Sequence, residues 1–214
     1  MIKKAIFFLS ITLLSCVAYS TPQDSLYSQQ LFDNFSLQRR ELSWMQLGFR
    51  IGYNISLTDQ YSPTDEMKNL FSAEFGAFAR FGKYVYAEVG IGYLFHKGHY
   101  TSNFPIPPVS NEIVETRFLQ IPLKAVGYIP LKEKFAIFPA VGVLYQPLIQ
   151  VSENYIGYSK KNITNHQFLF TASLGVRISY FTLEVAYRKS ITPFFSDRTS
   201  GKPSYISIMA GFMF

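Results

Sequence analysis

The sequence predicts an all-β fold, an eight-stranded antiparallel up-and-down transmembrane β-barrel. Three observations predict it. Charged residues make up only 16% of the 214 residues, whereas a typical soluble domain has roughly 25%. Apolar residues alternate with small or polar residues, with a period of two, in eight segments. Long polar links between these segments alternate with short ones, which is typical of bacterial outer-membrane barrels.

Residues 1–20 are typical of a signal peptide. A basic start and an apolar run too short to span a bilayer precede Ala18 and Ser20, whose small side chains fit a cleavage site in front of Thr21. The alternative is lipoprotein processing, which makes Cys16 a lipid-modified N-terminus. Cleavage after Ser20 fits the general pattern better, and it leaves a mature chain without cysteine and hence without a disulfide.

Residues 21–43 show no clean hydrophobic period, and we expect them to form a periplasmic leader in front of a barrel over residues 44–214. The first strand, residues 47–57, has apolar side chains at every odd position from Leu47 to Leu57. A helix with this pattern would be apolar all round, so the pattern predicts a strand. The same alternation predicts seven further strands, at residues 71–81, 85–96, 119–125, 135–146, 168–179, 181–188 and 205–214.

The composition of the two strand faces predicts which of them meets lipid. The polar face is rich in Gly, Ala and Ser and has few charges, which suits the inside of a narrow barrel. The strands are about 10 to 13 residues long, the length that a tilted strand needs to cross the hydrocarbon. Strands of a soluble sandwich are usually about 5 or 6 residues long. Strand length therefore favours a membrane barrel with its apolar face outward.

The lengths of the links between the strands predict which end of the barrel is periplasmic and which is outer. Short links at residues 82–83, 131–134 and 180 are predicted periplasmic turns, and the longer polar links are predicted outer loops, at residues 58–69, 98–112, 150–166 and 192–203. Aromatic residues near the strand ends predict two interfacial girdles. The turn-side girdle contains Phe81, Phe135, Tyr180 and Phe214, and the loop-side girdle contains Phe71, Phe95, Phe168 and Tyr187.

Charged residues on the polar face predict an ion-pair network in the lumen, formed by Arg50, Glu74, Arg80, Glu88, Lys124, Arg177, Glu184 and Arg188. A charge in a confined interior has to be paired or hydrated. We expect Glu88 to lie between Arg80 and Lys124, and Glu184 to lie beside Arg177. Because eight strands leave an interior just wide enough for side chains, the network is expected to fill the lumen rather than line a pore.

Two short motifs carry a resemblance to a known family. The segment from Phe118 to Lys124 resembles the Tyr-Leu-Glu-Ile-Pro-Leu stretch of the PorT-like outer-membrane β-barrel family of Bacteroidetes-type bacteria, with Phe118 in place of Tyr and Gln120 in place of Glu. The last residues resemble the signal that bacterial barrels present to the barrel-assembly machinery, through Ile208, Ala210, Phe212 and Phe214. The resemblance implies an integral protein of a Gram-negative outer membrane, in contact with outer-membrane lipid and the assembly machinery. Some relatives take part in protein secretion.

The sequence contains no pattern that indicates catalysis, a cofactor or a metal, and we expect none of these sites. Its histidines are His96, His99 and His166, and none is followed two residues later by the Ser of the lipid A deacylase pattern His-x-Ser. A metal site of these three histidines is the less favoured interpretation, because loop histidines at this spacing are more often solvated. A small lipid-modifying enzyme of the lipid A deacylase or acyltransferase type remains the alternative function.

Binding is the function that the sequence favours, either structural or through an envelope protein partner reached by the loops or the leader. The net charge of +6 falls to +4 when Lys3 and Lys4 leave with the signal, and there is no basic-aromatic patch, so nucleic acid is not expected as a partner. The outer loops contain aromatic and basic residues that either contact a partner protein, a glycan or lipopolysaccharide phosphates, or else pack on each other or lie in the headgroup belt. They are Tyr61, Tyr100, Phe104, Tyr155, Tyr158, Phe194, Phe195, Lys160, Lys161 and Arg198.

Overall fold

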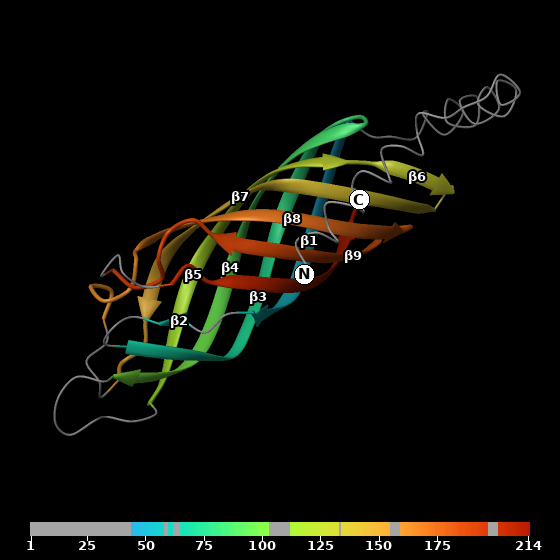
Figure 1. Cartoon of the computed structure of the whole chain (residues 1–214). Helices are drawn as coiled ribbons and strands as arrows, with labels where there is room; N and C mark the ends of the chain where they lie inside the picture. Colours follow the sequence, from blue (N-terminus) through green and yellow to red (C-terminus); the bar gives the residue numbers. More distant parts are fainter. Residues whose placement is uncertain are drawn as a thin grey trace, which may run out of the picture. The chain divides into compact units, whose positions relative to one another are not determined.

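The chain folds into one antiparallel sheet whose strands follow the alternation of the sequence (Figure 1). The computed structural model describes residues 44–57, 60–61, 65–102, 112–132, 134–154, 159–196 and 201–214. The signal peptide at residues 1–20, the leader at residues 21–43 and Cys16 lie outside the described residues. The strands are β1 (Met45–Ser56), β2 (Gln60–Tyr61), β3 (Asp65–Gly82), β4 (Val85–Ser102), β5 (Glu112–Gly127), β6 (Ile129–Lys132), β7 (Phe135–Val151), β8 (His166–Ile178), β9 (Phe181–Ser190) and β10 (Ser204–Met213).

The sheet closes on itself because β1 pairs with β3 on one side and with β10 on the other. Gly48, for example, lies opposite Phe78 of β3 and Met213 of β10. Of the ten strands in the described part of the chain, β2 and β6 are short additions to β3 and β7, so eight long strands form the barrel. The predicted eight-stranded antiparallel barrel is confirmed, and each predicted strand overlaps one of the long strands.

The predicted outer loops are too long, because the ends of four strands extend into the ranges predicted as loops. β3 begins at Asp65, β4 ends at Ser102, β5 begins at Glu112 and β7 ends at Val151. In these extensions the backbone ladder continues although the hydrophobic alternation fades, since one face no longer meets lipid. The long strands project past their shorter neighbours at the left of Figure 1.

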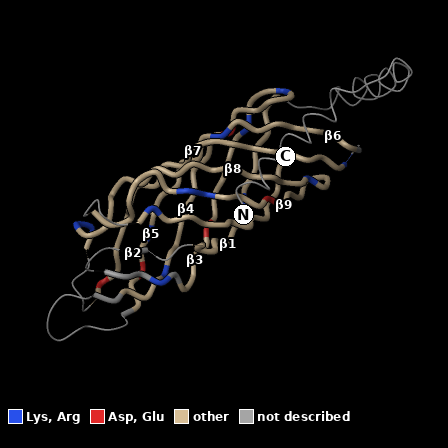
Figure 2. The backbone as a smooth tube through the Cα atoms, viewed as in Figure 1, with Lys and Arg blue, Asp and Glu red and all other residues tan. Residues whose placement is uncertain are grey.

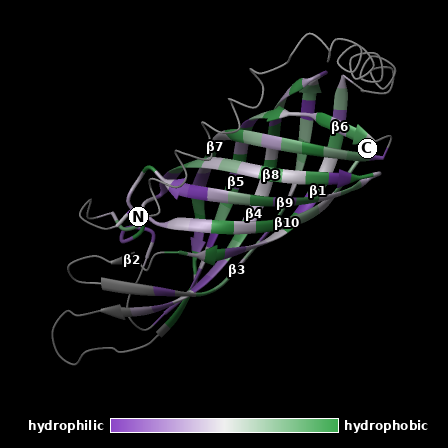
Figure 3. Cartoon of the chain, turned by 45° about the vertical axis from the view of Figure 1, so that its right-hand side comes forward, coloured by the Kyte–Doolittle hydropathy of each residue, from purple (hydrophilic) through white to green (hydrophobic). Residues whose placement is uncertain are grey.

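The outer surface of the barrel is apolar. Ile51 is 65% exposed, Leu123 is 57% exposed and Leu174 is 59% exposed. Single exposed apolar residues are common on soluble proteins, but a continuous band of them is rare on a surface that faces water. Hydrophobic residues recur along the strands in Figure 3, and charged residues are sparse along their middle parts in Figure 2. The outward face is therefore the lipid-facing surface of a transmembrane barrel, as the alternation predicted. None of the described residues forms a helix long and apolar enough to cross a membrane.

Aromatic rings close the seam between the first and last strands. Phe49 of β1 lies 5.7 Å from Phe212 and 5.8 Å from Phe214, measured between ring centroids, and Phe212 lies 5.8 Å from Phe181 of β9. The backbone ladder reaches the end of the chain, because Phe214 donates to the Leu47 carbonyl at 2.8 Å and accepts from the Leu47 amide at 3.1 Å. The seam is thus held by both hydrogen bonds and ring packing.

Candidate functional site

The candidate site is the lumen, where charged side chains from five strands meet. Glu88 of β4 is fully buried and its carboxylate contacts three cations. It accepts from Arg50 of β1 at 2.8 Å and from Arg80 of β3 at 2.8 Å, and the Lys124 ammonium of β5 lies 3.6 Å away. A buried carboxylate is tolerated only when its oxygens are paired in this way.

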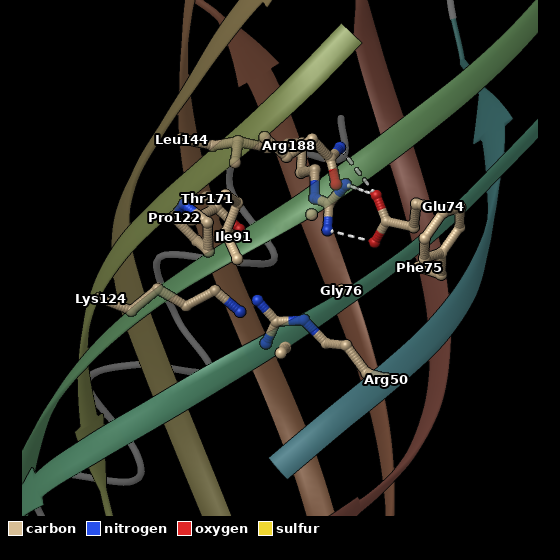
Figure 4. A pocket seen from close by; sticks show the side chains of 13 residues that line it. Arg50, Glu74, Phe75, Gly76, Ile91, Pro122, Lys124, Leu144, Thr171 and Arg188 are labelled. Carbon is tan, nitrogen blue, oxygen red and sulfur yellow. Dashed lines mark hydrogen bonds and ion pairs between the residues drawn. The ribbon is translucent and has the colours of Figure 1, made fainter. Parts of the chain in front are cut away.

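Glu184 of β9 completes the network on the other side of the lumen. Its carboxylate accepts from Lys124 at 2.7 Å and lies 3.7 Å from the Arg50 guanidinium. Figure 4 shows the Arg50 and Lys124 head groups turned toward each other. These two like charges are held together because Glu88 and Glu184 each contact both of them.

A second ion pair lies beside this network. Arg188 of β9 binds Glu74 of β3 through two nitrogens, at 2.5 and 2.7 Å, which is the bidentate geometry that Arg makes with carboxylates (Figure 4). Gln120 donates to the same carboxylate at 2.9 Å, and Asn54 accepts from Arg188 at 3.3 Å. Asn54 also accepts a hydrogen bond from Ser207. The pair is therefore surrounded by neutral hydrogen-bonding groups.

Aromatic rings fill the lumen on the periplasmic side. The Arg80 guanidinium lies between two of them, 5.0 Å from the Phe78 centroid and 4.6 Å from the Phe138 centroid, in cation–π geometry. Tyr86 is fully buried and packs edge-on against Tyr128 at 6.1 Å. These side chains occupy the cross-section below the ion pairs.

The structure places Arg177 outside the predicted network. The register sets Glu184 opposite Gly175 and sets Arg177 opposite Thr182, two residues nearer the periplasmic turn. Within the described part of the chain the Arg177 guanidinium binds the Ser179 carbonyl at 2.6 Å and the Tyr128 hydroxyl at 3.4 Å. The expected pair of Arg177 with Glu184 is therefore wrong, and Lys124 and Arg50 take that place.

The outer mouth of the barrel is filled by two loops. Phe194 and Phe195 are each 2% exposed, and their rings pack edge-on at 5.2 Å. Ile163 of the preceding loop forms a β-bridge with Phe195, and the Thr164 amide donates to the Phe194 carbonyl at 2.9 Å. The rings join a buried apolar cluster with Leu94, Tyr100, Val114, Phe118 and Leu148. We call this arrangement the mouth cluster.

Three of the predicted loop aromatics belong to the mouth cluster. Tyr100, Phe194 and Phe195 pack inside the barrel rather than lying on its surface. Lys160 and Lys161 are exposed. The side chains of the remaining candidates lie outside the described residues: Tyr61, Phe104, Tyr155, Tyr158 and Arg198.

Between the mouth cluster and the ion pairs lies a polar layer. His96, Gln146 and Gln167 are buried there, next to a cavity of about 20 Å³ that also reaches Arg188. A second cavity of about 10 Å³ lies against the ion pairs. Each has room for about one water molecule. Neither is large enough to conduct hydrated ions.

The histidines lie apart from one another. His96 points into the lumen, whereas His99, three residues along the same strand, points to the other face, as the two-residue period requires. His166 is exposed on β8 and its Nδ1 lies 2.7 Å from the Tyr145 hydroxyl. Among the described residues, no group of three or more His, Cys, Asp or Glu side chains is placed to hold a metal ion.

Neutral polar side chains also belong to the lumen site, whereas the residues of the predicted assembly signal lie outside it. Asn54 and Gln120 bind the Arg188–Glu74 pair, and Ser207 binds Asn54. None of the three was predicted, although their place on the polar face of the alternation is a signal that could have found them. The residues predicted as the assembly signal lie on β10 and directly after it, with Ile208, Phe212 and Phe214 exposed toward lipid and Ala210 half-buried. Their recognition by the assembly machinery stays a prediction.

No protein-family model and no curated protein matches the sequence. Solved structures similar to it include OprG of Pseudomonas aeruginosa, with 11% identity, a TM-score of 0.48, and coverage of 79% of this chain and 94% of that one. Ail of Yersinia pestis, in complex with the heparin analogue sucrose octasulfate, has 15% identity, a TM-score of 0.43, and coverage of 80% and 100%. The N-terminal barrel domain of Pseudomonas aeruginosa OprF has 8% identity, a TM-score of 0.41, and coverage of 79% and 97%.

These likenesses carry no information on function, and none points to the PorT-like family. The assignment of the fold rests on the strand pairing and on the surface. The ladder is closed, the exterior is apolar and the polar side chains point inward, which together satisfy the requirement that backbone polar groups in lipid be paired within the protein. The chain is an integral outer-membrane β-barrel.

Proposed function

We propose that this protein is a non-catalytic membrane anchor that acts through its outer loops and its leader, with a structural or partner-binding role in the cell envelope. The observation that carries the proposal is the filled lumen. Aromatic rings on the periplasmic side, ion pairs in the middle and the mouth cluster on the outer side occupy it in turn. A barrel filled in this way supports function on its surfaces rather than transport through its centre.

The resemblance to the PorT-like family supports an accessory role in protein secretion. In the structure the motif lies on β5, where Gln120 and Lys124 point into the lumen and bind Glu74 and Glu184. Ile121 and Leu123 of the same motif point toward lipid. The motif therefore contributes to the interior, and a secretion partner would be contacted elsewhere, through the loops or through residues 21–43.

Site-specific photo-cross-linking in intact cells tests this proposal. A photoreactive amino acid is placed at Lys161 in an outer loop, at a position in residues 21–43, and at Leu174 on the lipid-facing surface as the control. We expect the loop or leader position to give a discrete adduct with one envelope protein, and the Leu174 position to give none. Absence of an adduct at every loop and leader position would contradict a partner-binding role.

One observation favours the alternative, a lipid-modifying enzyme. The exposed His166 side chain and the Tyr145 hydroxyl lie 2.7 Å apart on the outward face, beside Phe168 of the loop-side girdle. A histidine and a hydroxyl in contact with outer-leaflet lipid are groups that acyl chemistry uses. Mass spectra of lipid A from cells with the parent protein and with His166→Ala distinguish the two functions, because only an enzyme changes the lipid.

A further inference from the structure

Two basic side chains lie at the loop-side aromatic girdle, on the outward face of β4 and β5. Lys97 follows Phe95 by two residues on the same face of β4, and Arg117 of β5 lies opposite Phe95 in the register. The Lys97 ammonium lies 5.3 Å from the Phe95 ring centroid. Both cations are thus adjacent to an aromatic ring of the girdle.

The girdle places these cations at the depth of the lipid headgroups. Tyr53, Phe71 and Phe95 form a row of rings around the barrel, with centroid distances of 5.6 and 6.3 Å. Rows of aromatic residues at this position mark the boundary between hydrocarbon and headgroups. Two residues of a strand tilted by about 45° rise about 5 Å, at about 3.3 Å per residue. Lys97 therefore lies just beyond the hydrocarbon boundary.

The balance of charge at this place is positive. Lys97 pairs with Glu115 at 2.5 Å, and the two side chains are 38% and 28% exposed. An exposed pair of this kind contributes little stability, so Lys97 is able to bind a second anion. Arg117 donates one hydrogen bond to Gln150 at 3.3 Å, and a guanidinium has five N–H donors. Two cations and one carboxylate leave a net charge of +1 on a surface that faces lipid headgroups.

We propose that Lys97 and Arg117 bind a phosphate group of an outer-leaflet lipid headgroup. The Arg117 guanidinium supplies planar, paired donors that match phosphate oxygens, and the Lys97 ammonium adds a point charge beside them. The acyl chains of the same lipid lie against the apolar surface below, where Ile121 and Leu123 of β5 are exposed. The site thus combines a charged contact for the headgroup with an apolar contact for the chains.

Binding of lipid A, a glycolipid with two phosphate groups, tests the proposal. The protein is purified from outer membranes, and native mass spectrometry measures its affinity for lipid A and for dephosphorylated lipid A. Each basic residue near an anionic membrane surface contributes about a five-fold gain in affinity. We expect Lys97→Gln with Arg117→Gln to weaken the binding of lipid A about 25-fold and to leave the dephosphorylated lipid unaffected. Glu115→Gln removes the competing carboxylate and should tighten binding.

The matched control removes the same charge at the other end of the barrel. Lys83→Gln with Lys134→Gln, both exposed near the periplasmic turns, should leave the affinity for lipid A unchanged. Equal binding of lipid A by the Lys97 and Arg117 double variant and the parent would overturn the proposal. So would an equal loss for both lipids, or an equal loss in the control. If the double variant fails to fold, weaker or unchanged binding by Glu115→Gln overturns the proposal by itself.

Discussion

The Glu88 carboxylate holds the Arg50 guanidinium at 2.8 Å although β3 lies between their strands in the sheet. Because the contact passes over β3 on the lumen side, it connects two strands, β1 and β4, that the backbone ladder does not join directly. Glu88 also contacts Arg80 and Lys124, which lie directly opposite it on the neighbouring strands β3 and β5. The interior ion pairs are therefore expected to matter for the stability of the whole barrel.

Glu88→Gln should destabilise the barrel strongly. The change leaves Arg50, Arg80 and Lys124 with less negative charge in a buried site, and loss of one partner of a buried ion pair typically costs about 3–5 kcal/mol. Unfolding in urea, followed by the mobility of the folded form on gels, measures the free energy of unfolding. Glu153→Gln on the exposed outer side is the matched control and should have little effect. Equal stability of Glu88→Gln and the parent would show that the network does not support the fold.

The purified protein should form no steady pore. The mouth cluster, the ion pairs and the periplasmic rings close the lumen at successive levels. Single-channel recording in planar bilayers, with an established porin as the positive control, is the measurement. Large and steady currents from the parent protein would contradict the filled lumen.

Ile91→Arg should destabilise the barrel in lipid. Ile91 is 59% exposed on the outward face of β4, between Phe95 of the loop-side girdle and Val85 at the turn-side start of the strand. An Arg on the lipid face at the bilayer midplane costs about 2–4 kcal/mol. Ile91→Leu keeps the site apolar and should unfold like the parent. If the arginine variant is as stable as the leucine variant, the outward face does not meet lipid.

Phe195→Ala should loosen the mouth cluster without unfolding the barrel. The Phe195 ring is 2% exposed and packs on Phe194 and Tyr100. Its removal leaves a cavity under the two loops, so the hydrogen bond from the Thr164 amide to the Phe194 carbonyl should open more often. Hydrogen exchange should show faster exchange at Thr164 with unchanged exchange in β8 and β9. Phe168→Ala, on the lipid-facing surface, is the control, and unchanged exchange at Thr164 in Phe195→Ala would refute the packing role.

Gly175→Ala should be costly although it adds only a methyl group. The new Cβ would overlap the Phe138 ring, which also contacts the Arg80 guanidinium. Overpacking of this kind typically costs about 1–3 kcal/mol. Gly201→Ala is the matched control, because nothing lies within 4 Å of a Cβ at that position. Urea unfolding of the two variants compares the costs, and equal stability would mean that Phe138 has room to move.

The alternation of the sequence predicted the strands because each side chain in a membrane barrel faces either lipid or the lumen. It failed at the outer ends of β3, β4, β5 and β7, where the ladder continues but lipid no longer selects apolar residues. The charged residues of the lumen were found for the same reason as the strands. The ion-pair partner of Glu184 was predicted wrongly, because the choice of partner depends on the register between strands. The register puts Gly175 rather than Arg177 opposite Glu184. The burial of Phe194 depends on how two loops meet, and no local pattern encodes that.

The pairing of Phe214 with Leu47 joins the two ends of the described barrel. This contact has the largest sequence separation in the sheet, and contacts of this kind pay the highest loop-closure entropy. The barrel therefore closes only when β10 is in place. Until then β1 and β10 each present an open edge that is able to pair with a foreign strand. These two edges therefore have to be shielded from other strands until they pair with each other.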